Sequence, residues 1–362
     1  MRKVTINDIA KAAGVSKTAV SFAFNDPSQL AQATASHIRE VAEQMGYTPD
    51  PVARSMTTKR TNALGLLLPQ DIAKVMENPF YTEFMRGVGK VCGQVGRTLM
   101  LVPPLWGSTL EAIPHAAVDG FIVLGLEIDR GEVQLMRQRR IPFVIVDSEA
   151  LDDMPSVNVD DYSGAHAIMT HVLSKGHRHV AVIGIESGKT GFDQYTGTLA
   201  ARLAGYREAL AAHHLSFDHR NVQFVEAPSS WEGGQMAFER IWSRECRPTA
   251  IVAMSDILAI GALETAKAQQ VSLPEELSIA GFDDLPEARH IRPALTTVRQ
   301  PTEEKGRIAA ELLMASLENH QAVAHYVLPT EVIIRKSVVR PYQDRIEQPK
   351  QTLHNQKVKI TR

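Results

Sequence analysis

The first 47 residues carry hydrophobic positions at the spacing of short helices. In the first helix the apolar side chains recur at intervals of three, four and seven residues, as one face of a helix requires: Ile6, Ile9, Ala10 and Ala13. Thr5 and Asp8 have the spacing of a capping box, which gives this helix a defined start. Turn signals at Gly14, 25–27 and Gly46 predict helices at about 5–13, 16–24 and 34–45, which together form a compact unit.

From Leu64 onward the pattern changes to short continuous apolar runs separated by longer helical patterns. The runs cover residues 63–68, 99–102, 120–124, 143–146, 179–183, 223–225, 250–253 and 277–282. Continuous runs are typical of strands buried on both faces of a parallel sheet. Because about ten strands in one twisted sheet would be unusual, we expect two sheets, and hence two α/β lobes with a crevice between them.

Length and composition exclude several classes of protein. A chain of 362 residues allows two or three domains, and 44% hydrophobic with 22% charged residues is typical of a globular chain. No apolar run reaches the ~18 residues of a membrane helix, and the polar start lacks the apolar stretch of a secretory signal. We therefore expect a cytoplasmic chain with no membrane partner. Cys92 and Cys246 lie far apart and outside any cysteine–histidine cluster, so no metal, disulfide or cofactor is expected.

The net charge of −2 is unevenly distributed along the chain. Residues 1–61 hold eight Lys and Arg against five Asp and Glu, a net charge of +3, and the polar, aperiodic segment 341–362 is also at +3. Residues 62–340 consequently carry −8. A basic head on an acidic body fits a head that approaches a polyanion. We expect the segment 341–362 to be a disordered tail.

Two helices joined at Gly14 have the pattern of a helix-turn-helix, whose second helix enters the major groove of DNA. Ser16 can cap that second helix. The helix would then turn one apolar side inward and present three polar residues outward: Lys17, Thr18 and Ser21. Helix pairs joined by glycine are common, so the alternative is a packing module that does not touch DNA.

The segment 49–61 is predicted to be a linker that contains one further helix. Asp50 is a favourable N-cap and Pro51 is favoured at the first position of a helix. At about two turns the helix is marginal on its own. A helix that forms only against DNA or a partner copy would couple DNA affinity to the geometry of the attached domain.

Nine short motifs follow one another along the chain. They are VTINDIAKAAGVS (4–16), MGYTP (45–49), ARSM (53–56), NPFY (78–81), VDG (118–120), GHRH (176–179), RLAGY (202–206), GFDD (281–284) and PALTTV (293–298). Together they resemble the LacI/GalR (lac-repressor-type) family of transcriptional regulators, over residues 2 to about 340. The resemblance implies a helix-turn-helix head at 1–48, a hinge helix at 49–61 and a two-lobed α/β body of the periplasmic-binding-protein type (type I) at 62–340. Its lobes are expected at about 62–162 with 293–325, and at 163–292 with 326–340.

The resemblance also implies how the head binds DNA. A homodimer would read a pseudo-palindromic operator in double-stranded DNA. Phosphate-side contacts are expected from Thr5, Ser16, Asn25 and Thr34, base-edge contacts from Lys17, Thr18, Ser21 and Phe22, a further DNA contact from Tyr47, and minor-groove contacts from Ala53 and Met56. Phe22 stands where an arginine often reads guanine, so a different half-site is expected. Ala31 and Ala35 replace a serine and an arginine of the family, which weakens the cap of the third helix.

For the body, the resemblance implies a small-molecule effector between the lobes. The expected effector residues are Phe80, Tyr81, Asp147, Asp160, Thr198, Arg202, Trp231, Asp256 and Asp283. Carboxylates and a guanidinium bind vicinal hydroxyls, and an aromatic face packs on a sugar ring, so a sugar or a similar polar molecule is the expected class. Effector binding would change the angle between the lobes and so bias the hinge helices. Thr196 lies where purine-responsive relatives place a basic residue, which argues against a purine.

Each of these interpretations has an alternative. Asp256 and Asp283–Asp284 could cap helices instead of binding a ligand, and Met56 could be an ordinary core residue. The segment ending in Gly188-Lys189-Thr190 is close to a phosphate-binding loop, which would suggest an ATPase or a sugar kinase. That loop needs four residues between its glycines, and here there are three. We therefore expect a chain that is not an enzyme.

Overall fold

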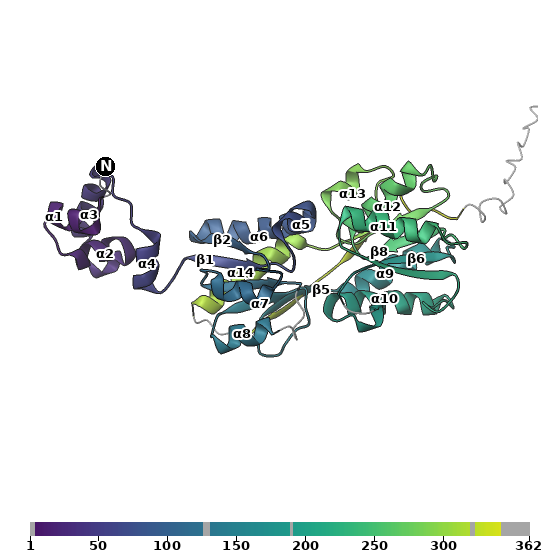
Figure 1. Cartoon of the computed structure of the whole chain (residues 1–362), viewed down its shortest axis with the longest axis horizontal. Helices are drawn as coiled ribbons and strands as arrows, with labels where there is room; N and C mark the ends of the chain where they lie inside the picture. Colours follow the sequence, from purple (N-terminus) through teal and green to yellow (C-terminus); the bar gives the residue numbers. More distant parts are fainter. Residues whose placement is uncertain (1–3, 126–130, 189–190, 319–322, 342–362) are drawn as a thin grey trace, which may run out of the picture.

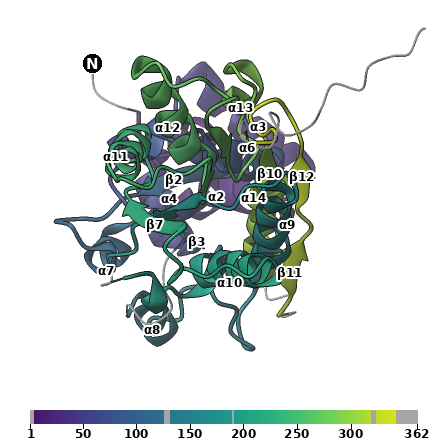
Figure 2. The same cartoon turned by 90° about the vertical axis from the view of Figure 1, so that its right-hand side faces the viewer.

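The computed structural model describes residues 4–125, 131–188, 191–318 and 323–341. The chain forms a small helical head, a linker with one helix, and two α/β lobes, in that order from the N-terminus (Figure 1). Figure 2 views the same molecule along its length. No helix in the described part of the chain is both long enough and apolar enough to span a membrane.

The head is built from three α-helices and a 3-10 turn: α1 (Ile6–Ala12), α2 (Lys17–Asn25), η1 (Pro27–Gln29) and α3 (Gln32–Gln44). Ile9, Val20 and Ile38, one from each helix, are fully buried against one another. The Asp8 carboxylate accepts a hydrogen bond from the Thr5 N–H at 2.9 Å, one half of a capping box, and a second from the Thr5 hydroxyl at 2.7 Å. Helix α3 starts two residues before the expected position, and its N-cap, Ala31, makes no side-chain cap bond.

The linker contains α4 (Pro51–Thr58), which begins where Asp50 and Pro51 predict. The Asp50 side chain accepts a hydrogen bond from the Val52 N–H at 2.9 Å. The helix ends at Lys59, whose φ of 54° is left-handed and stops further helical bonding.

The first lobe is a six-stranded parallel sheet with the strand order β11-β5-β4-β3-β1-β2. Its strands are β1 (Ala63–Leu67), β2 (Thr98–Val102), β3 (Gly120–Leu124), β4 (Phe143–Val146), β5 (Ser156–Val159) and β11 (His325–Leu328). Its helices are α5 (Ile72–Glu77), α6 (Pro79–Val95), α7 (Thr109–Ala112), η2 (Ile113–His115), α8 (Glu132–Gln138) and α14 (Thr302–Leu317). The strands β1 and β3 are buried along their whole length, as their continuous apolar runs predict.

The second lobe is a four-stranded parallel sheet with the order β7-β6-β8-β9. Its strands are β6 (Val180–Ile185), β7 (Val222–Ala227), β8 (Ala250–Ala253) and β9 (Ser278–Ala280). Its helices are α9 (Asp161–Ser174), η4 (Phe192–Gln194), α10 (Gly197–Ala212), α11 (Trp231–Trp242), α12 (Asp256–Ala268) and α13 (Pro286–His290). Both sheets are therefore of the doubly wound type that the pattern of runs predicts.

The chain passes between the lobes three times, after β5, between β10 (Thr297–Arg299) and α14, and between β11 and β12 (Glu331–Ile333). Strands β10 and β12 pair antiparallel. The expected lobe boundaries were wrong in two places. Thr296, just before β10, and Arg299, its last residue, bridge to Ala280 and Asp283 of the second lobe, so this segment runs alongside that lobe's last strand. Residues 326–328 belong to β11, which pairs with β5 in the first sheet.

Helices α6 and α14 cross in very close contact on one face of the first sheet. A Cβ atom added to Gly87 would lie 1.9 Å from the Glu303 carbonyl oxygen, and one added to Gly306 would lie 2.2 Å from the Phe84 carbonyl oxygen. Only glycine permits this approach from both sides. The two helices therefore pack backbone against backbone.

Candidate functional site

The outward face of α2 carries the polar residues that the helix-turn-helix pattern predicts. Lys17 and Thr18 are exposed, and Val20 and Ala23 are buried on the opposite side. The helix begins with a side-chain cap, since Ser16 Oγ accepts a hydrogen bond from the Ala19 N–H at 3.1 Å. This leaves one face of α2 free to enter a groove.

Two further α2 residues complete this face. Ser21 is half-buried and its hydroxyl accepts a hydrogen bond from the Asn25 side-chain amide at 3.2 Å. Phe22 is 37% exposed, which is a high exposed fraction for an aromatic residue. The α2 face therefore combines one amine, two hydroxyls and one exposed ring.

The residues expected to contact phosphate are placed around the start of α1, around α2 and near the start of α3. Thr5 and Ser16 are exposed N-caps, and Thr34 is half-buried in the first turn of α3. Helix N-termini offer unpaired N–H groups to an anion. Tyr47 lies differently, because its ring packs on Phe24 with centroids 5.7 Å apart, and burial raises the pKa of its phenol.

Helix α4 presents two large apolar side chains to solvent. The exposed fractions are 68% for Val52 and 79% for Met56, and the spacing of four puts both on one side of the helix. Met56 is therefore not a core residue of the single chain, which removes that alternative. Ala53, next to this side, is also exposed.

A second group of polar residues gathers where the lobes meet. We call it the junction cluster: Asp147, Asp161, Arg202, Asp283, Gln300 and Lys305. The Lys305 Nζ on α14 donates to both carboxylate oxygens of Asp147 and to Gln300 Oε1, each at 2.7 Å. Gln300 in turn donates to Asp283 Oδ1 at 2.6 Å. A chain of hydrogen bonds thus runs from a carboxylate of the first lobe to one of the second.

Arg202 holds the second-lobe side of the junction cluster. Its guanidinium donates to Asp161 Oδ1 at 2.8 Å and to the Met254 carbonyl oxygen, and it lies 3.7 Å from the centre of the Phe282 ring. Arg202 and Asp161 are both buried. Burial raises the pKa of Asp161 against the opposing effect of Arg202, so the two charges depend on each other.

Asp283 of the junction cluster and the neighbouring Asp256 form a pair of buried carboxyl groups. Burial raises the pKa of Asp283 to about 6, and burial with the neighbouring Asp283 raises the pKa of Asp256 well above its usual value. Asp256 accepts hydrogen bonds from the Leu285 N–H and the Thr297 hydroxyl. Asp256 thus holds the loop after β9; the alternative considered for it was the cap of a helix, and it is the first residue of α12, whose N-cap is Ser255.

The remaining expected effector residues divide into two groups. Phe80 and Tyr81 face the junction cluster: Lys305 Nζ lies 5.0 Å from the Phe80 ring centre, and burial raises the pKa of Tyr81 to about 12. Asp160 instead caps α9, with its carboxylate accepting from the Ser163 N–H at 2.9 Å. Trp231 donates its indole N–H to Glu264 at 2.8 Å, and Thr198 is half-buried at the start of α10.

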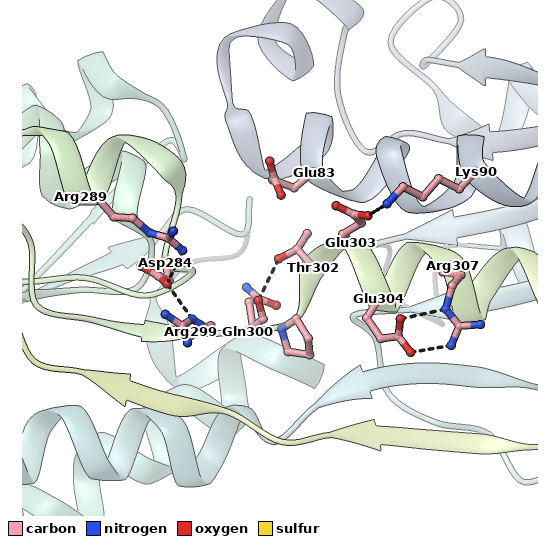
Figure 3. A pocket seen from close by; sticks show the side chains of 11 residues that line it. Glu83, Lys90, Asp284, Arg289, Arg299, Gln300, Thr302, Glu303, Glu304 and Arg307 are labelled. Atoms are coloured by element: carbon pink, nitrogen blue, oxygen red, sulfur yellow. Dashed lines mark hydrogen bonds and ion pairs between the residues drawn. The ribbon is translucent and has the colours of Figure 1, made fainter.

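A hollow of about 440 Å³ lies beside the junction cluster, between α6 and α14 of the first lobe and α13 of the second (Figure 3). Charged side chains of both signs line it. Of the junction cluster only Gln300 reaches this hollow, and none of the nine expected effector residues does. This hollow therefore lies beside the expected effector site and does not coincide with it.

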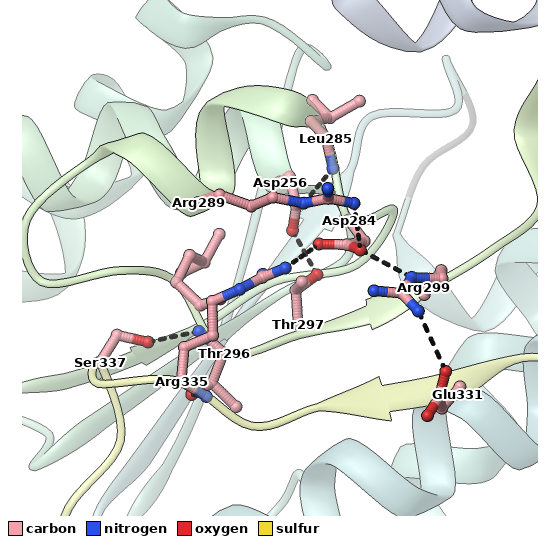
Figure 4. A network of polar contacts seen from close by, with 11 residues as sticks. Asp256, Asp284, Leu285, Arg289, Thr296, Thr297, Arg299, Glu331, Arg335 and Ser337 are labelled. Carbon is pink, nitrogen blue, oxygen red and sulfur yellow. Dashed lines mark hydrogen bonds and ion pairs between the residues drawn. The ribbon is translucent and has the colours of Figure 1, made fainter.

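The second-lobe wall of this hollow is held by one buried carboxylate (Figure 4). Asp284, whose side chain is 1% exposed, pairs with Arg289, Arg299 and Arg335. Burial opposes its ionisation, but hydrogen bonds from Arg335 and Arg299 hold the pKa of Asp284 below its usual range. Asp284 therefore ties β10 and the segment after β12 to the loop after β9.

The sequence patterns did not identify four residues near the lobe junction: Asp161, Tyr206, Gln300 and Lys305. Lys305 had a recognisable signal, because it falls on the inward stripe of α14 with Ala309 and Leu313 and is completely buried. A lysine on an apolar stripe points to a buried partner. Lys189 and Thr190 of the possible phosphate loop lie outside the described residues.

Two segments of the chain match known protein families. Residues 5–50 match the family described as bacterial regulatory proteins, lacI family, and residues 169–338 match a periplasmic binding protein-like domain. The HTH-type transcriptional regulator Rv3575c of Mycobacterium tuberculosis is 31% identical over 353 residues, covering 92% of this chain and 96% of the relative. The repressor PurR of Klebsiella pneumoniae is 30% identical, with 92% and 96% covered.

Solved structures have the same architecture. A CelR–cellobiose complex matches with a TM-score of 0.68 at 26% identity, covering 92% of this chain and all of the other. The lac repressor dimer bound to operator matches with a TM-score of 0.78 at 19% identity, covering 93% and 100%, which shows the fold alone. The head, the linker helix and the two lobes therefore belong to a bacterial transcriptional regulator of the LacI family.

Proposed function

We propose that two copies of this chain bind a pseudo-palindromic operator, and that a small sugar-like effector between the lobes controls that binding. The exposed Val52 and Met56 on α4 carry the proposal. An eight-residue helix with an uncovered apolar side is marginal alone and needs a partner surface. A second α4 and a DNA minor groove would together provide that surface.

In this proposal each part of the head has a separate role. Lys17, Thr18, Ser21 and Phe22 read base edges in the major groove, where the Phe22 ring suits a thymine methyl group. Thr5, Ser16, Asn25 and Thr34 contact phosphates, with Tyr47 beside them. Ala53 and Met56 enter the minor groove, where two methionines from two copies separate a central base step. Operator binding also requires access to the chromosome, which places the chain in the cytoplasm.

The polar character of the junction cluster supports an uncharged polyhydroxyl effector. Both cations are already paired, Lys305 with Asp147 and Arg202 with Asp161. Three hydrogen bonds use all three donors of Lys305. The carboxylates keep acceptor capacity for hydroxyl groups, and the buried hydroxyls of Tyr206 and Ser255 have no hydrogen-bond partner among the described residues. The complexes of CelR with cellobiose and of an Enterococcus faecalis relative with ribose fit this class.

The test is selection of bound sequences from a random DNA pool, followed by thermal shift with a panel of neutral sugars, sugar acids and purines. The proposal expects a symmetric site and a stabilising neutral sugar. Weak binding without sequence preference would contradict the operator part. Stabilisation by sugar acids alone would contradict the effector class and leave the operator part standing.

A further inference from the structure

The carboxylate of Asp119 lies where the linker enters the body, just before β3. Asp119 Oδ1 accepts hydrogen bonds from the Thr61 N–H at 2.6 Å and the Thr61 hydroxyl at 2.9 Å. Its Oδ2 accepts from the Asn62 N–H at 3.1 Å and from Arg97 at 2.7 Å. The side chains of Arg97 and Asp119 are only 8% and 6% exposed. We call these four residues the linker clamp.

The backbone around the linker clamp is fixed as well. The Asp119 N–H donates to the Ala63 carbonyl oxygen at 2.8 Å, and the Thr98 N–H donates to the Asn62 carbonyl oxygen at 3.0 Å. Asn62 has a left-handed φ of 57°, so the chain turns sharply there. Both ends of this turn are thus hydrogen-bonded to the edge where β1, β2 and β3 begin.

An aspartate is required at the centre of the linker clamp. Four N–H or O–H groups donate to the two side-chain oxygens of Asp119. Only an ionised carboxylate can accept hydrogen bonds on both of these oxygens. Burial works against the charge, but the bonds from Thr61 and Arg97 outweigh it and lower the pKa of Asp119. An asparagine would turn an NH₂ group toward two of the donors and leave buried donors unpaired.

Helix α14 extends from the neighbourhood of the linker clamp to the junction cluster. Arg60 reaches the Leu317 carbonyl oxygen, at the end of α14, at 3.5 Å. Lys305 of the junction cluster lies near the start of the same helix. Helix α14 is about 24 Å long from its 16 residues and packs rigidly against α6. The residue beside the linker clamp and the cation of the junction cluster thus lie at opposite ends of one helix.

We infer that Asp119 is a positioning residue that fixes the direction in which the linker leaves the first lobe, so that the lobe sets the separation of the two heads on DNA. The inference rests on the proposed function, because it assumes two heads on one operator. A rotation of the first lobe is then passed to α4 without being lost in a flexible joint.

The experiment measures operator affinity as a function of half-site spacing. The operator selected by the wild-type chain is compared with versions that carry one or two extra central base pairs. We expect the wild-type chain to lose at least about tenfold in affinity per added pair, within the range of a base-pair defect. Asp119→Asn should bind the original site about tenfold more weakly and lose less than about threefold on insertion. Thr61→Val, which keeps the charge, should show a smaller change in the same direction.

Asp153→Asn is the matched control, because Asp153 pairs with Arg137 on the exposed surface of the same lobe. It should behave as the wild-type chain does. Amide hydrogen exchange in the segment 61–62 should accelerate in Asp119→Asn and in no control. The inference is overturned if Asp119→Asn keeps the spacing preference, or if its affinity falls equally at all spacings in step with its melting temperature. If Asp119→Asn does not fold, an unchanged spacing preference in Thr61→Val overturns it. A wild-type chain that selects no operator overturns the proposed function first.

Discussion

The ionisation of the Asp283 carboxyl group can be followed through the pH dependence of effector binding. Asp256, Arg202, Lys305 and Gln300 surround this group, and burial raises its pKa to about 6. If its ionised form accepts a hydrogen bond from an effector hydroxyl, effector affinity should rise with pH through about 6 and fall roughly tenfold from pH 7 to pH 5. Calorimetric titration across this range checks the slope.

Asp283→Asn should remove this pH dependence, and Asp218→Asn in a loop of the second lobe serves as the control. A flat affinity profile in the wild-type chain would contradict the assignment. The same raised pKa affects stability in a defined direction. The folded chain binds the proton more tightly than the unfolded chain, so this contribution to stability is complete below pH 4 and is lost as pH rises through 6.

Lys305 is the buried cation of the junction cluster, and its removal should cost stability. Lys305→Met leaves the Asp147 carboxylate without its partner, which we expect to lower the free energy of unfolding by about 3 kcal/mol. Lys305→Met with Asp147→Leu should recover most of that loss, because no charge is then left alone. Denaturant unfolding measures both. Arg137→Met, in an exposed pair, should change stability by under about 1 kcal/mol.

The sequence located the charged residues of the lobe junction only in part. Asp147, Arg202 and Asp283 were expected from the family resemblance, and the structure brings them together in the junction cluster. Asp160 was expected to contact the effector, yet its neighbour Asp161 pairs with Arg202 and Asp160 caps α9. Adjacent residues at a strand-to-helix turn face opposite ways, and only the packing of α9 on α10 decides which one faces Arg202.

Helix α4 is the element on which DNA binding depends most in the proposed function. Asp50→Ala removes the side-chain cap from the Val52 N–H, a loss of about 1 kcal/mol per helix. Because α4 is marginal, this loss should appear in operator affinity. Two copies then give a decrease of roughly thirtyfold. Fluorescence anisotropy with the selected operator measures the change.

Ser230→Ala is the matched control for Asp50→Ala, because Ser230 caps α11 in the second lobe through the Gly233 N–H at 3.0 Å. It should lower the stability of the body and leave operator affinity within about twofold. Equal effects of the two substitutions on DNA binding would contradict a special role for α4.

The strands were predictable where hydrophobic runs are continuous, and the start of α4 from its capping residues. The eight predicted runs correspond to β1, β2, β3, β4, β6, β7, β8 and β9. Strand β5 mixes Ser156 and Asn158 with valines, and β11 is an edge strand with mostly exposed side chains. Strands of this kind are specified by their neighbours in space. The short strands β10 and β12 pair with each other although they lie far apart in sequence, and Arg299 of β10 also bridges to Asp283.

The charge distribution of the whole molecule predicts how DNA binding responds to salt. In each copy the head with its linker (residues 1–61) carries +3 and residues 62–340 carry −8, so two copies bring six net positive charges to the duplex while the bodies repel it. We expect operator affinity to fall with salt with a log–log slope no steeper than about −6. Titrations at several potassium chloride concentrations give the slope. An affinity independent of salt would contradict a phosphate-contacting head.

The three passages of the chain between the lobes have a consequence for biosynthesis. All four strands of the second-lobe sheet have been made once residue 280 leaves the ribosome. The first lobe, although it begins earlier in the chain, lacks α14 and its edge strand β11 until residue 328 has emerged. The second lobe in turn needs Ser337, which hydrogen-bonds Ile279 of β9, and Val338, which packs into its core, so neither lobe is complete until nearly the whole body has been made. Until residue 328 has emerged, the nascent first lobe exposes the unpaired edge of β5 to other chains, a hazard that a chaperone could cover.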